Sequence, residues 1–459
     1  MNSIDTIAAV ATPPGRGGVG IIRISGPLVA HISAEILGRV PKPFKASHCL
    51  FKDRHKQVLD DGIAIFFPGP TSFTGEDILE LQGHGGHIVL DMLLNRCLEL
   101  GARVAQPGEF SERAFLNDKL DLTQAEAISD LIDSGSEQAA RSALRSLQGD
   151  FSKEVNSLLT KMIEMRVYVE AALDFPEEEI DFLADKRVLN RLEEIKKQLV
   201  SITNKAKQGS LLRNGIHLVI IGKPNAGKSS LLNALSGKEV AIVTEIAGTT
   251  RDVLHESINL DGMPLHLIDT AGLRESDDPV EKIGIERAWE AIEKADMAIV
   301  LIDESISEKN VLQKEGSQTT NKSDSFDQIL RKLPKSMSII VVHNKIDLIN
   351  KKAGKIGNDI YISAKQRIGI NFLTDELKNR MGFQQYTEDG FIARRRHLHS
   401  LQRTQKLVDS AEMQLIKFNA GELMAEELRQ AQDELGKITG KYTPDDLLGE
   451  IFSNFCIGK

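Results

Sequence analysis

Cysteine is scarce in this sequence, and its scarcity excludes several kinds of protein. Only three cysteines stand among 459 residues, at Cys49, Cys97 and Cys456. An odd number of widely separated thiols indicates neither a disulfide framework nor a zinc knuckle. Cys456 occupies the position of a C-a-a-X prenylation cysteine, but Gly458 and Lys459 do not fit the last two positions of that signal. The reason for this thiol therefore has to come from the rest of the chain.

Long apolar runs and an excess of positive charge are also missing. No stretch of about 18 apolar residues is present to span a bilayer, and the N-terminus lacks the basic and then apolar pattern of a signal peptide. We therefore expect a cytoplasmic protein with reduced thiols. Lys and Arg number 57 against 66 Asp and Glu, and the net charge of -9 predicts no general affinity for a polyanion. A nucleic acid would have to bind at a local patch.

The length and the patterning of the chain indicate a multidomain protein. At 459 residues the chain is long enough for about three ordinary domains. The first, residues 1–118, combines β-like runs at 6–11, 18–24 and 62–67 with an apolar-periodic stretch at 87–100. This mixture predicts an α+β domain. The sequence Thr123-Gln-Ala-Glu126 then has the form of a capping box, so we expect a helix to start there.

Two helical blocks flank a segment with a different rhythm. Apolar residues spaced three or four apart predict the buried stripe of one long helix, and they are Leu144, Leu147, Phe151, Val155, Leu158, Met162, Met165 and Val169. From Ile216 to about Leu377 a strand, loop and helix rhythm predicts a mostly parallel sheet, in which the polar stretch 305–327 is a solvated insertion. Helical spacing resumes after Phe391. We therefore expect a discontinuous α-helical domain, 119–212 and 380–459, with an α/β domain, 213–379, inserted into it.

The α/β segment begins with a phosphate-binding pattern. An apolar run from Ile216 leads into Gly222-Lys-Pro-Asn-Ala-Gly227-Lys228-Ser229 and then into a helical sequence. The glycines let backbone amides surround phosphates, Lys228 offers a positive charge to their outer oxygens, and the Ser229 hydroxyl can bind magnesium. A strand before the loop and a helix after it make this pattern typical of a P-loop nucleotide site.

Later motifs indicate guanine rather than adenine. His266-Leu-Ile-Asp269-Thr-Ala-Gly272 ends a strand in an aspartate suited to the magnesium shell and a glycine whose amide can sense a γ-phosphate. In Asn344-Lys345-Ile-Asp347, the Asp347 carboxylate can accept both donors on the edge of guanine, a pattern that adenine lacks. Ser363-Ala-Lys365 completes the base site, and Gly248-Thr249-Thr250 supplies a loop that can close over magnesium. Four motifs in this order predict a Ras-like α/β P-loop GTPase domain.

One residue departs from the Ras-like pattern. Leu273 follows Gly272 where Ras-like proteins place the glutamine that orients the attacking water. Another group must orient the water, and another positive charge must stabilise the transition state. Glu281 and Asn225 are candidates, although each also has an ordinary structural explanation, Glu281 as a solvated residue at a helix start and Asn225 as a turn former.

Taken together, the motifs resemble the MnmE family of tRNA-modifying GTPases, which is also called TrmE. The resemblance covers the whole chain and includes Asp5 to Arg23, Phe73 to Gly86, Pro107 to Leu122, the GTPase motifs and the terminal Cys-Ile-Gly-Lys. It implies a folate-binding N-terminal domain that dimerises, a helical domain with an inserted GTPase domain, and a flavoprotein partner, MnmG or GidA. With that partner the family builds an aminomethyl or carboxymethylaminomethyl group on C5 of the wobble uridine of certain tRNAs.

The resemblance also implies site residues. Arg23, Glu80, Lys119 and Lys459 would contact a reduced folate, 5,10-methylenetetrahydrofolate or 5-formyltetrahydrofolate, whose carboxylates suit the cations and whose pterin amine edge suits Glu80. Asn225, Thr244, Ile246 and Thr249 would hold a potassium ion, and Ser229 and Thr250 would hold magnesium. GTP would be bound by Asn225, Ala226, Gly227, Lys228, Ser229, Ser230, Thr244, Glu245, Ile246, Ala247, Gly248, Thr249, Thr250, Asp269, Thr270, Ala271, Gly272, Asn344, Lys345, Asp347, Ser363, Ala364 and Lys365.

The same resemblance implies the catalytic roles. Potassium beside the phosphates would supply the charge that an arginine finger supplies elsewhere, Lys228 would contact the phosphates, and Glu281 would orient the water. We expect two GTPase domains to face each other across the nucleotide. Cys456 would lie near the one-carbon chemistry as a nucleophile or proton relay, with simple packing as the alternative.

Other functions compete with this one. A ribosome-assembly GTPase that binds RNA without covalent chemistry shares the P-loop, but such proteins usually carry a compact basic RNA module. The dense basic cluster here is Arg394-Arg-Arg-His397, which a solvated helix face explains as well as tRNA contact does. A membrane or scaffold GTPase lacks an apolar anchor here. His84-Gly-Gly-His87 suggests metal, but two histidines without a third ligand are more often structural.

Overall fold

The structure is a computed structural model, and it describes residues 5–174, 186–223, 225–236, 255–260, 262–268, 290, 292–293, 295–305, 333–334, 337–383, 390–441, 445–453, 455 and 458. The chain divides into two compact units. One comprises Met1–Ser129, Ser146–Leu199 and Ser400–Lys459, and the other comprises Asp130–Arg145 and Val200–His399. Each unit is described by itself below.

The N-terminal part of the first unit is a six-stranded sheet in the order β3-β4-β5-β2-β1-β6. The pairings within it are antiparallel, apart from the parallel pair formed by β1 and β6. Its elements are β1 (Ile7–Val10), β2 (Gly17–Ser25), α1 (Val29–Leu37), β3 (Ser47–Lys52), β4 (Val58–Phe67), β5 (Ile78–Gly85), α2 (His87–Glu99), β6 (Arg103–Val104) and α3 (Glu109–Leu116). The predicted α+β character and the expected β-runs and helix are confirmed.

Strand alternation gives this sheet two different faces. Ile22, Ile24, Leu79 and Leu81 point to one face and form a core with apolar residues of α1 and α2. The intervening residues of β2 and β5, which include Arg23 and Glu80, point to the other face. Register brings this pair together, because Arg23 lies directly opposite Glu80 across the two strands.

The expected capping box is displaced by two residues. Helix α4 spans Leu122–Ile132, and Asp121 caps it, because Asp121 Oδ1 accepts from the Gln124 amide at 3.0 Å while Gln124 Oε1 accepts from the Asp121 amide at 3.0 Å. The Thr123 hydroxyl instead lies 2.6 Å from Asp121 Oδ1 and 2.7 Å from Ser152 Oγ. The prediction of a cap at Thr123 was therefore wrong, since the aspartate two residues earlier takes the free amide.

The expected single long helix is two helices. Helix α5 spans Glu137–Leu147 and helix α6 spans Asp150–Asp174, and they are separated at Gly149, whose backbone has a left-handed φ of 87°. Leu144 therefore belongs to α5, where it is 45% exposed. From Phe151 to Val169 the predicted stripe is fully buried in α6. The apolar spacing in the sequence continues across Gly149, so spacing alone could not show that the helix breaks at this glycine.

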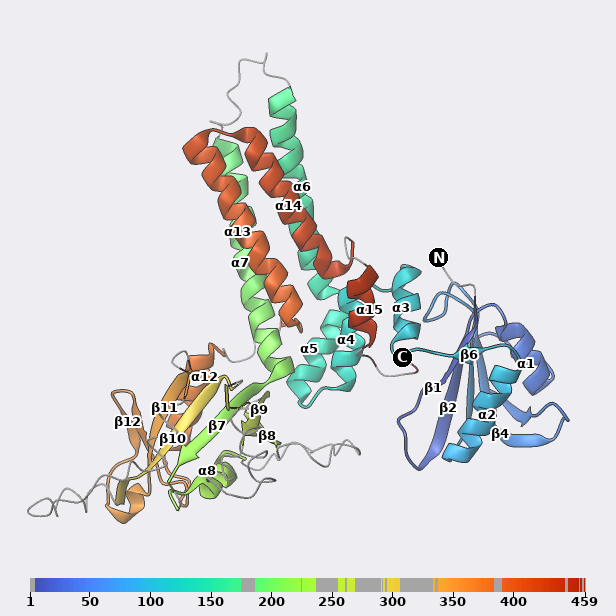
Figure 1. Cartoon of the computed structure of the whole chain (residues 1–459), viewed down its shortest axis with the longest axis horizontal. Coiled ribbons are helices and arrows are strands. Elements are labelled where there is room, and N and C mark those ends of the chain that lie inside the picture. The colour runs from blue at the N-terminus through green and yellow to red at the C-terminus, as the bar shows by residue number, and fades with distance from the viewer. Residues whose placement is uncertain are drawn as a thin grey trace, which may run out of the picture. The chain divides into compact units, whose positions relative to one another are not determined.

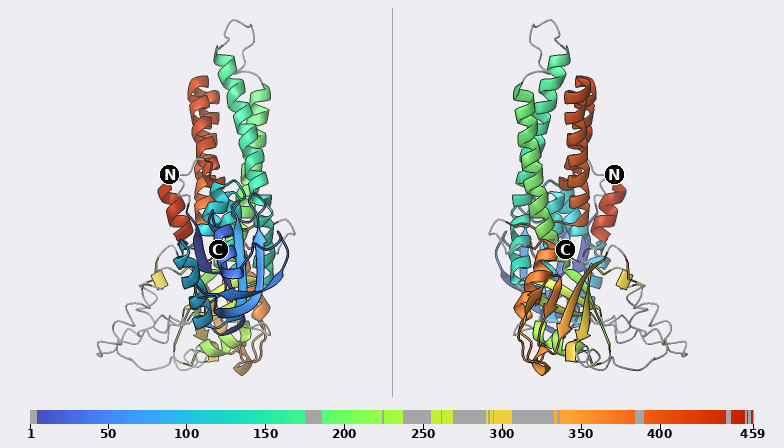
Figure 2. Two further views of the ribbon diagram at one scale, coloured as in Figure 1. Left: turned by 90° about the vertical axis from the view of Figure 1, so that its right-hand side faces the viewer. Right: turned by 90° about the vertical axis from the view of Figure 1, so that its left-hand side faces the viewer.

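Long helices complete the first unit. Helices α7 (Lys186–Asn214), α13 (Arg395–Phe418), α14 (Gly421–Thr439) and α15 (Asp445–Ser453) follow, and α6, α14 and parts of α7 and α13 run side by side (Figures 1 and 2). Lys196 of α7 pairs with Asp409 and Glu412 of α13 at 2.9 and 2.6 Å. In α14, Gln432 donates to the Met162 carbonyl of α6 at 3.0 Å. The described helices on both sides of the α/β segment therefore pack together.

The second unit contains a seven-stranded sheet in the order β12-β13-β11-β10-β7-β9-β8, whose four central pairings are parallel. Its elements are β7 (Ile216–Gly222), α8 (Lys228–Leu235), β8 (His255–Leu260), β9 (Met263–Ile268), β10 (Met297–Asp303), β11 (Ser338–Asn344), η1 (Ile346–Leu348), β12 (Gly354–Ile356), β13 (Asp359–Tyr361) and α12 (Ile370–Met381). Apolar side chains on both faces of β7 are buried, as a central parallel strand requires. The predicted α/β domain with a mostly parallel sheet is confirmed.

Most of the predicted polar insertion cannot be described. Its residues 306–327 lie outside the described residues. Within the described part of the chain, no helix is long and apolar enough to cross a membrane.

Candidate nucleotide and folate sites

The P-loop joins a buried strand to a helix whose N-terminus has no side-chain cap. Strand β7 ends at Gly222 and α8 begins at Lys228, with Gly227 as the N-cap at a left-handed φ of 100°. The N-terminal end of a helix attracts anions, and no acidic residue stands in the first turn of α8 to compete with one. Ser229 and Ser230 are exposed there. This is the arrangement that the sequence motif predicts for phosphates.

Lys228 and Asn225 take distinct places in the loop. Lys228 Nζ donates to the Gly222 carbonyl at 2.8 Å and so folds back over the loop that it follows. Asn225 has a left-handed backbone with φ of 63°, and it is exposed. Asn225 therefore lies at the surface of the loop.

Asn344 connects the base-binding segments to the P-loop. Its buried side chain donates from Nδ2 to the Ala226 carbonyl and accepts at Oδ1 from the Ala364 amide, both at 2.9 Å. Ser363 Oγ donates to Asp347 Oδ1 at 2.6 Å, which holds that carboxylate at the same edge of the sheet. Residues separated by more than 100 positions thus meet at the carboxyl ends of β7 and β11, where ligands bind in open α/β sheets.

Carboxylates behind the base-binding loop were not predicted from the sequence. Lys345 Nζ pairs with Asp303 Oδ2 at 2.7 Å. Burial favours a higher pKa for Asp303, but Lys345 and Ser305 hold the pKa below its ordinary value, so the carboxylate stays ionised. The next residue, Glu304, accepts from His343 and Lys351 at 2.6 and 2.9 Å. Asp303 and Glu304 directly follow the apolar residues of β10. Two acidic residues at the end of an apolar run are a signal that could have identified them in the sequence.

The remaining predicted nucleotide residues are less constrained or outside the described part of the chain. Lys365 is exposed beside Ala364. The segments 244–250 and 269–273 and the residue Glu281 lie outside the described residues. The structure thus brings together the P-loop, Asn344, Asp347, Ser363 and Ala364, and it leaves the magnesium loop and the water-orienting residue as predictions.

In the N-terminal sheet, Arg23 and Glu80 form a partly buried ion pair. Arg23 Nε and Nη2 donate to Glu80 Oε1 at 3.0 and 2.9 Å, and Gln82 Nε2 donates to Glu80 Oε2 at 3.2 Å. The Arg23 guanidinium also faces the rings of Phe73 and Phe110, whose centroids lie 5.9 and 5.8 Å away. The sequence named Arg23 and Glu80 separately, and it did not predict that they bind each other.

Lys119 contacts the same connection that carries Phe73. Lys119 Nζ donates to the Pro70 carbonyl at 2.9 Å, and its side chain is exposed. Both Lys119 and Arg23 therefore touch the segment between β4 and β5, which presents charge and an aromatic surface. Lys459 and Cys456 lie outside the described residues.

A second network beside Arg23 was also missed by sequence reasoning. Arg113 of α3 donates to Asp5 Oδ1, Glu76 Oε2 and Glu109 Oε1 at 2.6, 3.0 and 3.0 Å. Glu76 in turn accepts from Ser25, two residues after Arg23. Burial disfavours the charge on Arg113, but the three carboxylates raise its pKa above the ordinary value. This network fixes the start of α3 and the β4–β5 connection against β1 and β2.

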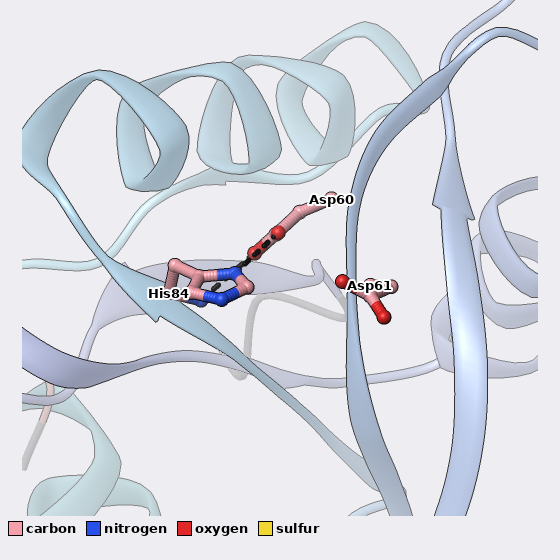
Figure 3. Close-up of side chains that lie close together, drawn as sticks. All are labelled: Asp60, Asp61 and His84. Atoms are coloured by element: carbon pink, nitrogen blue, oxygen red, sulfur yellow. Dashed lines mark hydrogen bonds and ion pairs between the residues drawn. The ribbon is translucent and has the colours of Figure 1, made fainter.

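Histidine 84 has a carboxylate partner rather than a second histidine. Asp60 Oδ1 lies 2.7 Å from His84 Nδ1, and Asp60 Oδ2 accepts from the His84 amide at 2.8 Å, with Asp61 close by (Figure 3). The hydrogen bond and charge of Asp60 raise the pKa of His84 above its ordinary value. Because both oxygens of Asp60 are already engaged with His84, these contacts have a structural explanation that needs no metal.

The basic cluster at residues 394–397 is partly used within the fold. Arg394 Nη2 donates to Asp130 Oδ1 at 2.8 Å, and Arg213 Nε donates to the same oxygen at 2.7 Å. Asp130 is 5% exposed and thus binds two arginines inside the second unit. Arg394 is therefore not a free cation on a solvated face, whereas Arg395 is exposed.

The described cysteines are not candidate nucleophiles. Cys49 and Cys97 are both buried, and burial raises the pKa of the Cys97 thiol to about 12. A thiol of that kind is inert at neutral pH.

Comparisons with known proteins place the chain among GTP-binding proteins of tRNA modification. A family model described as "MnmE helical domain" matches residues 122–456, and one described as "GTP-binding protein TrmE N-terminus" matches residues 6–119. The tRNA modification GTPase MnmE of Hydrogenovibrio crunogenus is 56% identical over 459 residues, which cover 99% of each chain. The protein of the same name from Proteus mirabilis is 55% identical over 464 residues, covering 100% of each chain. A GTP-binding protein of Sulfolobus solfataricus, solved with GDP, is 21% identical over 49% of this chain and 67% of its own, with a TM-score of 0.26.

Proposed function

This chain belongs to the MnmE family of tRNA modification GTPases, and we propose that it hydrolyses GTP to GDP and phosphate in the course of modifying C5 of the wobble uridine of certain tRNAs. A GTP hydrolase that acts in tRNA modification is what the full-length match supports. The match favours this function over a ribosome-assembly GTPase, the alternative that the motifs left open. The group built on the base is an aminomethyl or carboxymethylaminomethyl group.

The observation that carries the nucleotide assignment is the link through Asn344. One buried amide side chain holds the P-loop at Ala226 and the Ser363-Ala364 segment at the same time. A ligand with a phosphate group at the P-loop therefore presents its base to Asp347, which Ser363 positions. A carboxylate at that place accepts two hydrogen bonds from the N1–H and amino group of guanine, a donor pair that adenine lacks, so the site selects GTP over ATP.

The GTPase site has oxygen ligands suited to two cations. Ser229 and Thr250 would hold magnesium, and Asn225, Thr244, Ile246 and Thr249 would hold potassium. The exposed Ser229 hydroxyl in the first turn of α8 and the exposed Asn225 in the loop fit these assignments. The cations supply positive charge beside the phosphates, Lys228 contacts the outer phosphate oxygens, and Glu281 orients the water. The contacts of GTP also include Thr244 to Thr250 and Asp269 to Gly272.

The N-terminal sheet is the proposed site of a reduced folate, which supplies the one-carbon unit. Arg23, Glu80, Lys119 and Lys459 are its proposed ligands. The exposed ring of Phe73 beside Arg23 fits a flat heterocycle, and the exposed Lys119 fits a carboxylate. Cys456 is proposed as a nucleophile or proton relay.

The proposed assembly is a homodimer that works with a flavoprotein, MnmG or GidA, on tRNA in the cytoplasm. The proposed domains are an N-terminal domain at 1–118, a helical domain at 119–212 and 380–459, and a GTPase domain at 213–379. Two GTPase domains facing each other would complete the potassium site and couple hydrolysis to domain closure.

The test is steady-state phosphate release from GTP and from ATP, in potassium and in sodium buffers. We expect release from GTP in potassium, much slower release in sodium, and none from ATP above background. Lys228→Ala removes the charge on the phosphates and abolishes release, whereas Lys352→Ala, a change at an exposed lysine of the same domain, leaves the rate unchanged. Equal rates with both nucleotides, or with both cations, would contradict the guanine or the potassium assignment respectively.

Folate binding has its own test. Isothermal calorimetry with 5-formyltetrahydrofolate compares the intact chain, Lys119→Ala and a control, Lys45→Ala, at an exposed lysine of the same sheet domain. We expect saturable binding that Lys119→Ala weakens and Lys45→Ala does not. A folded, GTP-hydrolysing protein that binds no folate would remove the cofactor assignment while leaving the GTPase assignment intact.

A further inference from the structure

The C-terminal tail is fixed to the N-terminal sheet at Arg23. The guanidinium that binds Glu80 through Nε and Nη2 donates from Nη1 to the carbonyl oxygen of Gly458 at 3.2 Å. The contacts therefore join Arg23 of β2 to Glu80 of β5 and to Gly458, the penultimate residue of the chain. The contact lies within the first compact unit, although 435 positions separate Arg23 from Gly458 in the sequence.

The Arg23 side chain is held rigidly enough to act as an anchor. Its exposed fraction is 24% and that of Glu80 is 13%, and the strand register places the two residues directly opposite each other. The rings of Phe73 and Phe110 further limit the movement of the guanidinium. Gln82 holds the second oxygen of Glu80. The donor that reaches Gly458 is therefore positioned by Glu80, Phe73 and Phe110, and Gln82 in turn positions Glu80.

Gly458 has the conformation and the space of a residue that has to be glycine. Its φ is 92°, in the left-handed region that other residues rarely adopt. A Cβ at this position would overlap the Val10 carbonyl oxygen and lie 2.9 Å from Ala11 Cα. Both are backbone atoms at the end of β1, which cannot move aside as a flexible side chain would. The tail backbone at Gly458 therefore lies directly against the backbone at the end of β1.

A second contact precedes this one in the chain. Phe452 and Phe455 are buried with Leu122 and Ala125 in a cluster that joins α15 to α4. A Cβ on Gly108, just before α3, would lie 2.5 Å from the Phe452 carbonyl oxygen and 2.9 Å from Phe455 Cβ. The chain is thus held at Phe455 and again at Gly458. Cys456 lies between these two fixed points in the sequence.

We propose that Arg23 and Gly458 form a latch that positions the C-terminal tail, with Arg23 as a positioning residue and Glu80 as its support. This inference deepens the folate-site proposal and rests on it for its functional meaning, because the latch would set the place of Cys456 and Lys459 relative to the folate. The latch gives a role to the backbone carbonyl of Gly458, a residue that has no side chain to indicate a function. It also gives Arg23, a proposed ligand of the folate, a second contact, which is with the tail.

The latch can be tested at the peptide bond that it covers. Carboxypeptidase B removes a C-terminal lysine, and to release Lys459 it has to bind the Gly458 carbonyl that Arg23 holds. Cleavage therefore requires the latch to open, and its rate follows the open fraction when opening is fast. Intact-protein mass spectrometry gives the rate for the full chain, and a synthetic peptide of residues 454–459 gives the rate for an unlatched tail.

We expect the wild-type protein to lose Lys459 at least about ten times more slowly than the peptide. Arg23→Met and Gly458→Ala should both approach the rate of the peptide of matching sequence. Gly449→Ala, at an exposed glycine of α15 with nothing within 4 Å of the added Cβ, should stay as slow as wild type. If Arg23→Met fails to fold by circular dichroism, Glu80→Gln, which keeps the shape of the support and removes its charge, replaces it.

Wild-type cleavage at the peptide rate would overturn the latch, as would Arg23 and Gly458 variants that remain protected. Acceleration by Gly458→Ala alone would overturn the role of Arg23. The assay needs no folate, and calorimetry measures folate binding separately. A protected tail in a protein that binds no folate would overturn the cofactor proposal only, whereas an unprotected tail in a protein that binds folate would overturn the latch only.

Discussion

Replacing Asn344 by alanine should separate the phosphate-binding and base-binding segments of the GTPase domain. Asn344 is 2% exposed, and its amide makes one hydrogen bond to the Ala226 carbonyl and one to the Ala364 amide, both at 2.9 Å. Ala226 and Ala364 are buried as well. The substitution therefore removes two hydrogen bonds and also leaves a buried carbonyl and a buried amide without this partner.

The magnitude follows from those two bonds. A buried hydrogen bond contributes about 1 kcal/mol net, and an unsatisfied buried group costs about 1 to 3 kcal/mol. Because two such groups lose their partner, the local arrangement should lose about 2 to 6 kcal/mol. Nucleotide binding then has to order the two segments. If the free energy of GDP binding has to offset even the lowest value in that range, GDP affinity falls at least about tenfold, since a tenfold change corresponds to about 1.4 kcal/mol.

Fluorescent-GDP titration measures the affinity, and hydrogen exchange measures the local order. We expect faster exchange in peptides that contain Ala226 and Ala364 and unchanged exchange in the N-terminal sheet. Asn371→Ala is the matched control, because Asn371 is an exposed asparagine of α12 in the same domain. A GDP dissociation constant within about threefold of wild type for Asn344→Ala, which is under 0.7 kcal/mol, would refute the reasoning.

Three further predictions concern charge. Arg113→Met should destabilise the first unit by about 3 to 5 kcal/mol, because it removes the buried cation that Asp5, Glu76 and Glu109 share and leaves Arg103 as the remaining cation beside Glu109, and faster hydrogen exchange in β1 and β2 would show it. Burial raises the pKa of Glu109, but Arg103, the Gln106 amide and Arg113 hold that pKa below 4.5. Glu109 therefore stabilises the fold above pH 4.5, and this stability is lost as the pH falls through the lowered pKa, so Glu109→Gln should flatten acid unfolding followed by circular dichroism. Asp347→Asn should weaken GDP and favour xanthosine diphosphate in competition titrations, because an amide presents a donor where guanine also presents one.

The element types followed from the sequence where one local signal dominated. Continuous apolar runs bounded by motif glycines predicted β7 and the P-loop, and the β-like runs at 18–24 and 62–67 predicted β2 and part of β4, whereas β5 was not predicted. Helix boundaries were less predictable, because two similar local signals competed. Asp121 and Thr123 could each cap α4, and only the backbone shows that Asp121 does. The apolar stripe likewise continued through the break at Gly149.

The contacts between distant residues could not be predicted from the sequence. Arg23 and Glu80 lie 57 residues apart, and they meet because β2 and β5 pair in one particular register. A shift of that register by one residue would place Glu80 on the opposite face. The link from Asn344 to Ala226 spans 118 positions and depends on the order of β7 and β11 around β10. Local patterns name the residues, whereas strand order and register decide which of them touch.

The modification reaction itself tests the central claim most directly. The purified chain is incubated with GTP, potassium, magnesium, a reduced folate, the flavoprotein and unmodified tRNA, and the tRNA nucleosides are then analysed by mass spectrometry. The proposal predicts a uridine derivative carrying an aminomethyl-type group that appears with GTP and is absent when GTP is omitted or when Lys228→Ala replaces the wild-type chain. An unmodified wobble uridine in the complete mixture, or the same product without GTP, would contradict it.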